Sequence, residues 1–384
     1  MPNENRILAL MQTPLYYVAM RIGIDCRMYS SSFTGIGRYT HELVDHILSI
    51  DKENEIVLFF NNPEFKKFSH PRAKKVLVNA KHYSLSEQII FCRKLYKEKC
   101  DIVHFPHFNV PILYRRPYTI TIHDLTLSLY PGQKMTRWYH RLAYSFTIKN
   151  AVKKAKKIIA ISHNTKADLI HYLHAEPKKI HVIYNGVSPD FTLIPEVHKF
   201  DSTLKKYGIT KQFLFYAGVH RSHKNLPTLI KAFEMLSPDL NLQLVITGRP
   251  DPHYPEVQNA ASQNPNIILT NLVSEQELVY LYNAAMIFVF PSLYEGFGLP
   301  PLESMSCGTP VVASNSSSIP EICGEDNALF FDPQDPQDIA NKIDQLHRDS
   351  DLQAELIEKG ARHAAKFTWD KMAKESYRLI TGSK

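Results

Sequence analysis

The sequence predicts an α/β protein built from two doubly wound domains, each with a mostly parallel sheet between helices. Short runs of β-branched and aromatic residues alternate with helical patterns, and this series occurs twice along the chain. The length of 384 residues also exceeds the roughly 150 residues of an average domain. Ligands of such folds bind beyond the carboxyl ends of the strands, so the active crevice is expected there, between the two domains.

The first series of strands lies in the amino-terminal half. Strands are predicted at 21–25, 56–60, 75–79, 101–106, 119–124 and 157–162, which assigns an amino-terminal domain to residues 20–188. The apolar part of residues 1–19 is short and contains Gln12 and Pro14, and no basic cluster or cleavage site marks a signal peptide. An amino-terminal extension, followed by a domain that begins at Met20, is therefore expected.

A connecting segment and the second series follow. Residues 180–203 lack helical periodicity and contain Pro189 and Pro195, which favours an interdomain linker, assigned to 189–211. Strands are predicted at 213–218, 242–248, 266–270, 286–292, 309–314 and 328–332, within a carboxy-terminal domain of residues 212–366. Helices are expected over about 336–348 and 352–363. Residues 367–384 are expected to form a carboxy-terminal helix that packs back on the first domain.

The net charge of +7 is divided unevenly along the chain. Residues 1–200 contain 29 Lys and Arg against 16 Asp and Glu, a balance of +13, whereas residues 201–384 contain 16 against 22, a balance of −6. A basic first half indicates an anionic partner. Nucleic acid is not expected, because the chain has no finger, basic-zipper or RNA-binding signature. The inner face of a membrane fits better, with a solvated basic surface as the alternative.

Two basic segments carry apolar residues that would contact such a membrane. In the first segment, Lys94, Lys97 and Lys99 lie near Ile89, Ile90 and Leu95; in the second, Lys153, Lys154, Lys156 and Lys157 lie near Trp138 and Phe146. Peripheral contact with an anionic bilayer is the hypothesis, and amphipathic helices that pack on their own core are the alternative. The expected location is cytoplasmic, peripheral on the inner face of the plasma membrane.

Cysteines and candidate metal ligands exclude several classes of protein. The five cysteines form no C-x-x-C pair, so neither a disulfide framework nor a zinc ribbon is expected, and a reducing cytosol is the simplest setting. The only Asp-x-Asp, Asp349 to Asp351, lies in a charged helical segment, and the histidine pairs at 104–107 and 220–223 lack a third ligand. A protein without a bound metal or cofactor is expected.

The segment 291–314 carries the strongest signal for a site. A strand leads into a loop with Glu295, Gly296 and Gly298, and a helix is predicted to begin near Pro301, so free backbone N–H groups would face an anion there. The glycines allow the main chain to approach a ligand closely. Glu295 and Glu303 are suited to accept hydrogen bonds from sugar hydroxyls. A helix cap plus a surface acid is the alternative.

The run EGFGLPPLESMSCGTPVV (295–312) resembles the signature of the retaining group 1 glycosyltransferases of GT-B fold. Further stretches resemble the same family in the same order: TGIGRYTHEL from 34, TIHD at 121–124, YNGV at 184–187, HKNLPTLIKAF from 223, TNLVSEQELVYLYNAA from 270, SSIPEICG from 317 and FTWDKMA from 367. The resemblance covers nearly the whole chain from about residue 20. It implies the GT-B architecture, in which two Rossmann-like domains face each other across a cleft.

The resemblance also implies roles for residues of the carboxy-terminal half. Glu303 would bind the ribose of a nucleotide, and Glu295 would hold hydroxyls of the donor sugar, together with the backbone of Gly296, Phe297 and Gly298. Lys224 would pair with the diphosphate, where negative charge grows on the leaving group. Arg221 is a second candidate cation. At the positions where many members of the family have that arginine, this chain has His223 and Val219.

In the amino-terminal half, the resemblance singles out one histidine and two glycines. His123 lies at the end of the predicted strand at 119–124 and would line the donor-sugar site; without the resemblance, a packed or capped side chain is the more frequent role of such a histidine. Gly35 and Gly37 would form a turn near the diphosphate and the acceptor, between the first strand and the first helix. By itself this turn is a weak signal, because GIGRYT lacks the third glycine of the dinucleotide fingerprint.

The function implied is transfer of a hexose, with retention at the anomeric carbon, from a nucleotide diphosphate sugar to a glycan or lipid-linked glycan. GDP-mannose is the leading donor, because the full-length resemblance is greatest to bacterial polysaccharide mannosyltransferases. The amino-terminal domain would bind the acceptor. The alternatives are a soluble glucan or disaccharide synthase that uses UDP-glucose or ADP-glucose, and a noncatalytic scaffold that binds nucleotide sugars.

Overall fold

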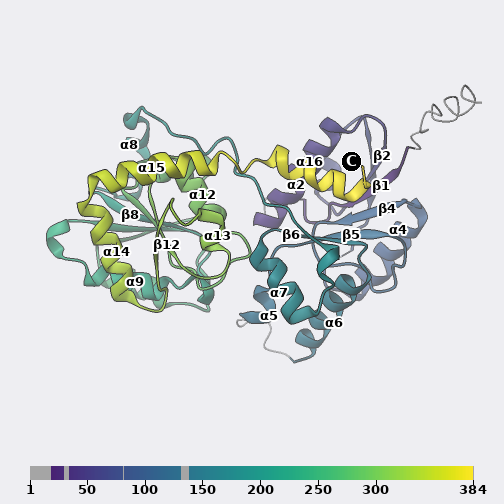
Figure 1. Ribbon diagram of the computed structural model, residues 1–384, viewed down its shortest axis with the longest axis horizontal. Helices are drawn as coiled ribbons and strands as arrows, with labels where there is room; N and C mark the ends of the chain where they lie inside the picture. The colour runs from purple at the N-terminus through teal and green to yellow at the C-terminus, as the bar shows by residue number, and fades with distance from the viewer. Residues whose placement is uncertain (1–18, 30–33, 81, 131–137, 384) are drawn as a thin grey trace, which may run out of the picture.

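The computed structural model describes residues 19–29, 34–80, 82–130 and 138–383, and it confirms two doubly wound α/β domains. The predicted extension of residues 1–19 lies almost entirely outside the described residues. Figure 1 shows the two domains side by side along the long axis, joined where the chain passes between them twice.

The first domain has a seven-stranded parallel sheet in the order β3-β2-β1-β4-β5-β6-β7. Its strands are β1 (Arg21–Asp25), β2 (Glu55–Phe60), β3 (Ala73–Leu77), β4 (Ile102–Phe105), β5 (Tyr118–Ile122), β6 (Lys157–Ala160) and β7 (Ile180–Val182). The six predicted strands are all present. The seventh, β7, was wrongly assigned to the connecting segment, because only three residues pair with β6 and so short a strand has no periodicity of its own.

Helices cover this sheet on both faces. They are α2 (Thr34–Ile50), α3 (Glu64–Lys67), the π-helix η2 (Glu87–Phe91) continuing into α4 (Cys92–Glu98), α5 (Thr126–Leu129), α6 (Trp138–Lys154), α7 (His163–Leu173) and the 3-10 turn η4 (Pro177–Lys179). The short α5 follows β5, at the edge of the sheet that faces the second domain.

The second domain has a six-stranded parallel sheet in the order β10-β9-β8-β11-β12-β13. The predicted strands are present as β8 (Phe213–Ala217), β9 (Gln243–Thr247), β10 (Ile267–Asn271), β11 (Ile287–Phe290), β12 (Val311–Ser314) and β13 (Leu329–Phe331). Its helices are α9 (Leu226–Met235), α10 (Glu256–Gln263), α11 (Glu275–Ala284), α12 (Leu299–Ser306), α13 (Ile319–Cys323), α14 (Pro336–Arg348) and α15 (Ser350–Ala364), with the 3-10 turns η6 (Ser222–Lys224) and η7 (Pro238–Leu240).

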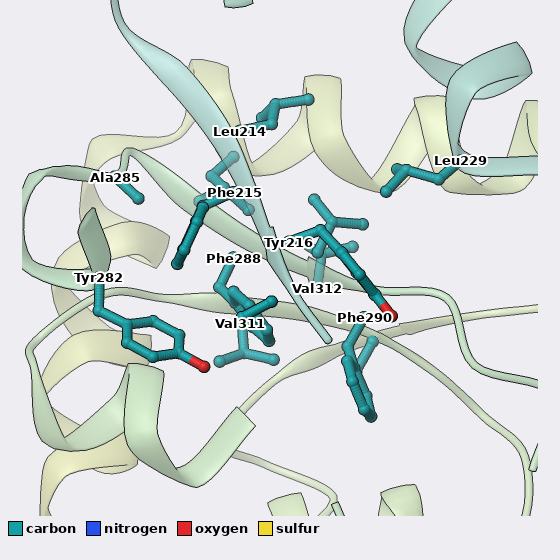
Figure 2. Packing of buried hydrophobic residues seen from close by; sticks show 14 of the residues in the cluster. Leu214, Phe215, Tyr216, Leu229, Tyr282, Ala285, Phe288, Phe290, Val311 and Val312 are labelled. Carbon is teal, nitrogen blue, oxygen red and sulfur yellow. The ribbon is translucent and has the colours of Figure 1, made fainter. Parts of the chain in front are cut away.

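The central strands of the sheets are rich in apolar residues because helices cover both faces there. Every residue of β8 and β11 is buried. Figure 2 shows Phe215, Phe288 and Tyr282 packed on one another in the second core, with Leu229 of α9 above the sheet. Each buried phenylalanine of this kind stabilises the fold by roughly 1.5–3 kcal/mol relative to an exposed one.

The predicted linker, 189–211, is not a free connection. It contains the 3-10 turn η5 (Val197–Phe200) and the helix α8 (Asp201–Tyr207). Phe191 and Ile209 are buried in the core of the second domain, and Phe200 packs against Tyr280. The segment therefore belongs to the packed structure of the second domain, since its apolar residues are buried there despite their irregular spacing.

The two passages of the chain between the domains lie against each other. Val187 pairs with Thr368 in an isolated parallel bridge, and its N–H donates to Phe367 O at 3.0 Å. Beyond this bridge, α16 (Trp369–Thr381) packs on α2 of the first domain (Figure 1). Trp369 and Met372 are buried in the amino-terminal core.

Two residues assigned to the hypothetical membrane surface are not available to it. Leu95 is completely buried in the core of the first domain. The ammonium group of Lys157 donates to Leu379 O of α16 at 3.0 Å. Among the described residues, no helix combines the length and the apolar character that crossing a bilayer requires.

Where the two passages of the chain between the domains lie against each other, we expect that no side chain is tolerated at Gly186. A Cβ there would lie 2.1 Å from the backbone nitrogen of Trp369. We expect Gly186→Ala to lower the free energy of unfolding by about 1–3 kcal/mol, because both backbones must move apart. Urea denaturation measures the loss. Gly35→Ala is the control, since a Cβ at Gly35 meets nothing within 4 Å; equal stability of the two variants would contradict the prediction.

A buried histidine should make stability depend on pH. His104 of β4 is completely buried, with its Nδ1 2.8 Å from Thr119 Oγ1, and burial lowers its pKa from 6.5 to about 3. The unfolded chain therefore binds a proton that the folded protein does not, and stability present above pH 6.5 is lost as the pH falls.

Between pH 6.5 and about 5, His104 should lower the free energy of unfolding by about 2 kcal/mol. Denaturation of the wild type and of His104→Gln at both pH values measures this difference, with the exposed His198→Gln as the control. The same pH dependence in His104→Gln as in the wild type would count against the prediction.

Candidate active site

The loop after β11 docks on the carboxyl edge of the first sheet. Tyr294 donates its hydroxyl to Asp168 Oδ2 of α7 at 2.7 Å and accepts from the N–H of Leu125 at 3.2 Å. Ser162 Oγ, at the N-cap of α7, donates to Gly296 O at 2.7 Å. These contacts bring the ends of β5 and β11 together, as the sequence predicts for a crevice between the domains.

A second contact at α7 uses a carboxylate of the other domain. Glu321 of α13 accepts from the N–H groups of His163 and Asn164 at 2.7 and 3.0 Å. These are donors of the first turn of α7, which has no intrahelical partner for them. A negative side chain at a helix N-terminus is favourable, so this contact stabilises the docked arrangement of the domains.

The closest backbone approach in the site is that of Gly296 to His123. A Cβ at Gly296 would lie 1.9 Å from His123 O. Only glycine fits there, because the obstacle is main chain that a rotamer change cannot clear. This contact places Glu295, the residue before Gly296, beside the end of β5.

His123 is buried and held in one orientation. Its Nε2 lies 2.8 Å from Pro106 O, and because a carbonyl only accepts, Nε2 carries the hydrogen. Burial lowers its pKa, so the imidazole is neutral at neutral pH. Tyr39 of α2 packs edge-on against the ring, with centroids 4.9 Å apart. The side chain is therefore a preorganised neutral group at the edge of the cleft.

Lys224 and Glu295 form an ion pair in the cleft. Lys224 Nζ donates to Glu295 Oε1 at 2.6 Å, and the two side chains are only 13% and 14% exposed. The lysine nitrogen also lies 5.7 Å from the ring centroid of Phe290, at the end of β11. The lysine follows β8 and the glutamate follows β11, neighbouring strands of one sheet, which explains how residues 71 positions apart meet.

Glu303 is buried in α12 and has partners from two domains. Its Oε2 accepts from the Tyr282 hydroxyl at 3.0 Å, and its Oε1 lies 3.5 Å from Nη1 of Arg38 in α2. Burial raises the pKa of Glu303, while the charge of Arg38 and the Tyr282 hydroxyl lower it in part. The same guanidinium pairs with Glu275, the first residue of α11.

Arg38 is a site residue that the sequence analysis missed. The available signal was its place directly after Gly37, in the stretch TGIGRYTHEL that resembles the family. Nothing local indicated its role, because its partners Glu275 and Glu303 lie 237 and 265 positions away. Its side chain reaches across the interface from the amino-terminal domain to the carboxylate expected to bind ribose.

Two of the predicted site residues are placed differently from the expectation, since Gly35 and Gly37 lie within the first turns of α2 rather than in a loop before it. The side chain of Phe297 is buried in the second core against Tyr184 and Phe367. This burial does not conflict with the role expected of Phe297, which is that of its backbone.

The N-terminus of α12 offers fewer donors than expected. The helix begins at Leu299, with Gly298 as its N-cap, so Pro300 and Pro301 fall in the first turn and supply no N–H. The N–H groups of Phe297 and Gly298 donate to no described residue. An anion would therefore be held by the loop before α12 more than by the helix itself.

Arg221 stands apart from the other predicted residues. Its side chain is exposed, at the N-cap of η6, and it makes no hydrogen bond or ion pair with a described residue. Together with burial and Lys224, its charge lowers the pKa of His223 to about 3. No group of three or more His, Cys, Asp or Glu within the described ranges is arranged to hold a metal ion, and metal independence stays a prediction.

Two family models match successive parts of the chain. The model described as "Glycosyltransferase Family 4" matches residues 33–191, and "Glycosyl transferases group 1" matches residues 200–363. Among curated relatives, the O-antigen chain mannosyltransferase B of Escherichia coli is 28% identical over 379 residues, which is 90% of this chain and 96% of that protein. The O-antigen chain mannosyltransferase RfbU of Salmonella typhimurium is 30% identical over 268 residues, 69% of each chain.

Another relative is longer. The serotype-specific mannosyltransferase WbdA of Escherichia coli is 31% identical over 225 residues, which is 56% of this chain but only 28% of WbdA. The similarity to WbdA therefore concerns a part of that protein.

Solved structures support the GT-B fold. A sucrose-phosphate synthase of Thermosynechococcus elongatus superposes with a TM-score of 0.77 at 19% identity, over 95% of this chain and 100% of the other. HepE of Anabaena in complex with UDP-glucose gives a TM-score of 0.75 at 17% identity, over 94% and 100% of the two chains. At these identities the likeness concerns the fold alone.

Arg38 should tune the charge state of Glu303. In Arg38→Ala the pKa of Glu303 should rise further, because a nearby positive charge is lost, whereas Glu275→Gln should lower it by removing a like charge. If Glu303 must be ionised to accept from ribose, nucleotide affinity falls as the pH drops through this pKa. The midpoint should shift upward in Arg38→Ala, and the shift should be small, since a partly exposed pair contributes below about 1 kcal/mol.

Calorimetric titration of GDP and UDP against pH measures that midpoint. The Glu275→Gln variant is the control of opposite sign, and Arg348→Ala, which breaks a surface pair with Asp344, controls for loss of an arginine. Midpoints that coincide in Arg38→Ala and Glu275→Gln would show that these side chains do not act through Glu303.

Proposed function

Because the chain belongs to the group 1 glycosyltransferases, we propose that it transfers mannose from GDP-mannose, with retention, to a glycan or lipid-linked glycan during cell-surface polysaccharide synthesis. The names of its relatives support the sugar and the pathway class: two are O-antigen chain mannosyltransferases, matched at 28% and 30% identity. A cytoplasmic location belongs to the proposal, and five buried free thiols agree with a reducing compartment.

The observation that carries the proposal is the partly buried pair of Lys224 and Glu295 beside the docked His123. A diphosphate in the cleft would take the lysine as its counter-ion, and Glu295 would then be free to accept hydrogen bonds from hydroxyls of the transferred sugar. Negative charge grows on the leaving group in the transition state. A cation already held at that place lowers the activation barrier more than a cation that must first move there. Lys224 would therefore do chemically what a divalent cation does in other phosphate sites.

The remaining residues would bind and orient the donor. Glu303, ionised and held by Tyr282, would accept from the ribose hydroxyls. The N–H groups of Phe297 and Gly298 would donate to the diphosphate. His123 would contribute its neutral ring near the transferred sugar, because its Nε2–H is already committed to Pro106 O. Positioning and electrostatics, rather than a covalent nucleophile, would then supply the rate.

Retention would follow from reaction on one face of the sugar. The leaving diphosphate would accept the proton of the acceptor hydroxyl as the new glycosidic bond forms, so that atoms and charges balance without an enzyme base. The transition state has oxocarbenium character, which the nearby Glu295 carboxylate would stabilise. The acceptor would enter from the amino-terminal domain.

Nucleotide binding gives the direct test of donor class. Thermal shift with GDP, UDP, GDP-mannose and UDP-glucose, in the presence of EDTA, should show the largest stabilisation with the guanine nucleotides. Largest stabilisation by UDP-glucose would instead favour the glucosyl alternative, and a shift that requires Mg²⁺ would overturn the metal-independent mechanism.

Two matched variants test the site. Glu303→Gln should weaken GDP binding by about tenfold, because hydrogen bonds to a charged group contribute roughly 1.5–3 kcal/mol. Glu295→Gln should lower kcat more than GDP affinity. The exposed Glu358→Gln, on α15, is the control. Full activity of both site variants would show that the site lies elsewhere.

A further inference from the structure

Exposed large apolar side chains concentrate on one part of the amino-terminal domain. Of the fifteen such residues among those the structure describes, ten lie between Tyr83 and Phe146. This stretch contains η2, α4, the segment 111–116 and the first half of α6. Scattered exposed apolar residues are ordinary, but a gathering of this kind marks an interaction surface.

The outer side of α6 carries a stripe of three of these residues. Trp138, Leu142 and Phe146 are 70%, 59% and 60% exposed, and their spacing of four places them on one side of the helix. The buried residues Ile148 and Val152 lie on the opposite side. The stripe therefore faces away from the core that holds the helix in place.

Positive residues continue this stripe. Lys149 and Lys153, three and seven positions after Phe146, fall on the same outer side and are exposed. Between Asp124 and Asp168 the sequence has nine Lys and Arg and not one Asp or Glu. An apolar stripe followed by basic residues is the pattern of a helix that lies at a bilayer surface.

The segment 111–116 connects α6 to η2 and α4 in space. Lys154 Nζ donates to Ile112 O at 3.2 Å, and the N–H of Ile112 donates to Gln88 Oε1 at 2.7 Å. The hydroxyl of Tyr96 donates to Leu113 O at 3.1 Å. These contacts join the elements into one surface, which we call the α4–α6 face: residues 88–97, 111–116 and 138–154 (Figure 1).

The acidic residues near this face are occupied. Glu87 is buried and pairs with Arg27 at 2.6 Å, and Glu98 is buried and pairs with Arg21 and Lys74 at 2.7 and 2.6 Å. Partial burial, followed by the charges of Arg115 and Lys153, lowers the pKa of Lys154. The three segments of the face contain no Asp or Glu, so no carboxylate within the face balances its positive charges.

We propose that the α4–α6 face docks the protein on an anionic lipid bilayer. Trp138, Leu142 and Phe146 enter the headgroup region, and the lysines and arginines around them contact anionic headgroups. The leucines and isoleucines of the face favour lipid over nucleic acid, which is bound through aromatic platforms. A protein partner of this face would need an acidic surface of matching shape. A bilayer needs no matching shape, because anionic headgroups pair with the basic residues and the apolar side chains enter the hydrophobic region beneath them.

The inference relies on the proposed function only for the purpose of the docking, which is to bring the cleft close to acceptors attached to lipid. Its test does not require activity. Flotation of the full chain with vesicles of phosphatidylcholine and phosphatidylglycerol should recover the protein in the lipid fraction. Vesicles of phosphatidylcholine alone should not, and added salt should reduce recovery because it screens the headgroup charge.

Paired variants identify the face. The triple change Trp138→Ser, Leu142→Ser and Phe146→Ser, and separately Lys149→Glu with Lys153→Glu, should each lower the bound fraction roughly tenfold. The controls are changes of exposed residues of the same types elsewhere: Met235→Ser with Leu272→Ser, and Lys205→Glu with Lys231→Glu.

The nucleotide-induced thermal shift of each variant shows whether it is folded and whether the donor site is intact. A shift equal to that of the wild type, combined with lost flotation, supports the proposal. Recovery in the soluble fraction with both kinds of vesicle overturns it, as does an equal loss of flotation in the control variants. If nucleotides do not change the melting temperature of the wild type, that result counts against the proposed function and not against the docking on the bilayer.

Discussion

The structure depends on the contact between the loop after β11 and the carboxyl edge of the first sheet. Gly296 lies directly against the carbonyl of His123, and its own carbonyl accepts from Ser162. Because this contact is made by main chain on both sides, no side-chain rearrangement can relax it, and it fixes how closely the two domains approach there. Glu295 and His123 belong to different domains, and their proximity in the cleft follows from this one approach.

Charged side chains in the cleft pair with one another. Lys224 is neutralised by Glu295, and Arg38 is shared between Glu275 and Glu303. Lys224, Glu295 and Glu303 are largely shielded from water, where a charge is costly unless it is paired. Removing the partner of one of them leaves its charge uncompensated. A nucleotide sugar that binds as proposed would replace partners in these pairs. That exchange would couple donor binding to the domain interface, since Arg38 comes from the first domain and Glu303 from the second.

The chain that crosses between the domains links this interface to the rest of the molecule. The bridge of Val187 and Thr368 holds the two passages together, and α16 continues from it onto α2, the helix that carries Arg38. The α4–α6 face lies on the same first domain, whereas the main contacts of α16 are with α2, β4 and β6. The domain thus has separate regions for the cleft, for the carboxy-terminal helix and for the proposed bilayer contact.

The sequence by itself determined the elements whose signal is local. Twelve of the thirteen strands overlap runs that the sequence predicts, because buried strands of a parallel sheet are rich in apolar residues, and Lys224, Glu295 and Glu303 stand in recognisable motifs. What depends on distant partners was decided by the tertiary structure alone. The three-residue β7 exists through its pairing with β6, Phe297 is in the core because Tyr184 and Phe367 surround it, and Arg38 meets Glu303 across 265 positions. Local patterns specify which residues are buried or exposed, but packing determines which of them meet.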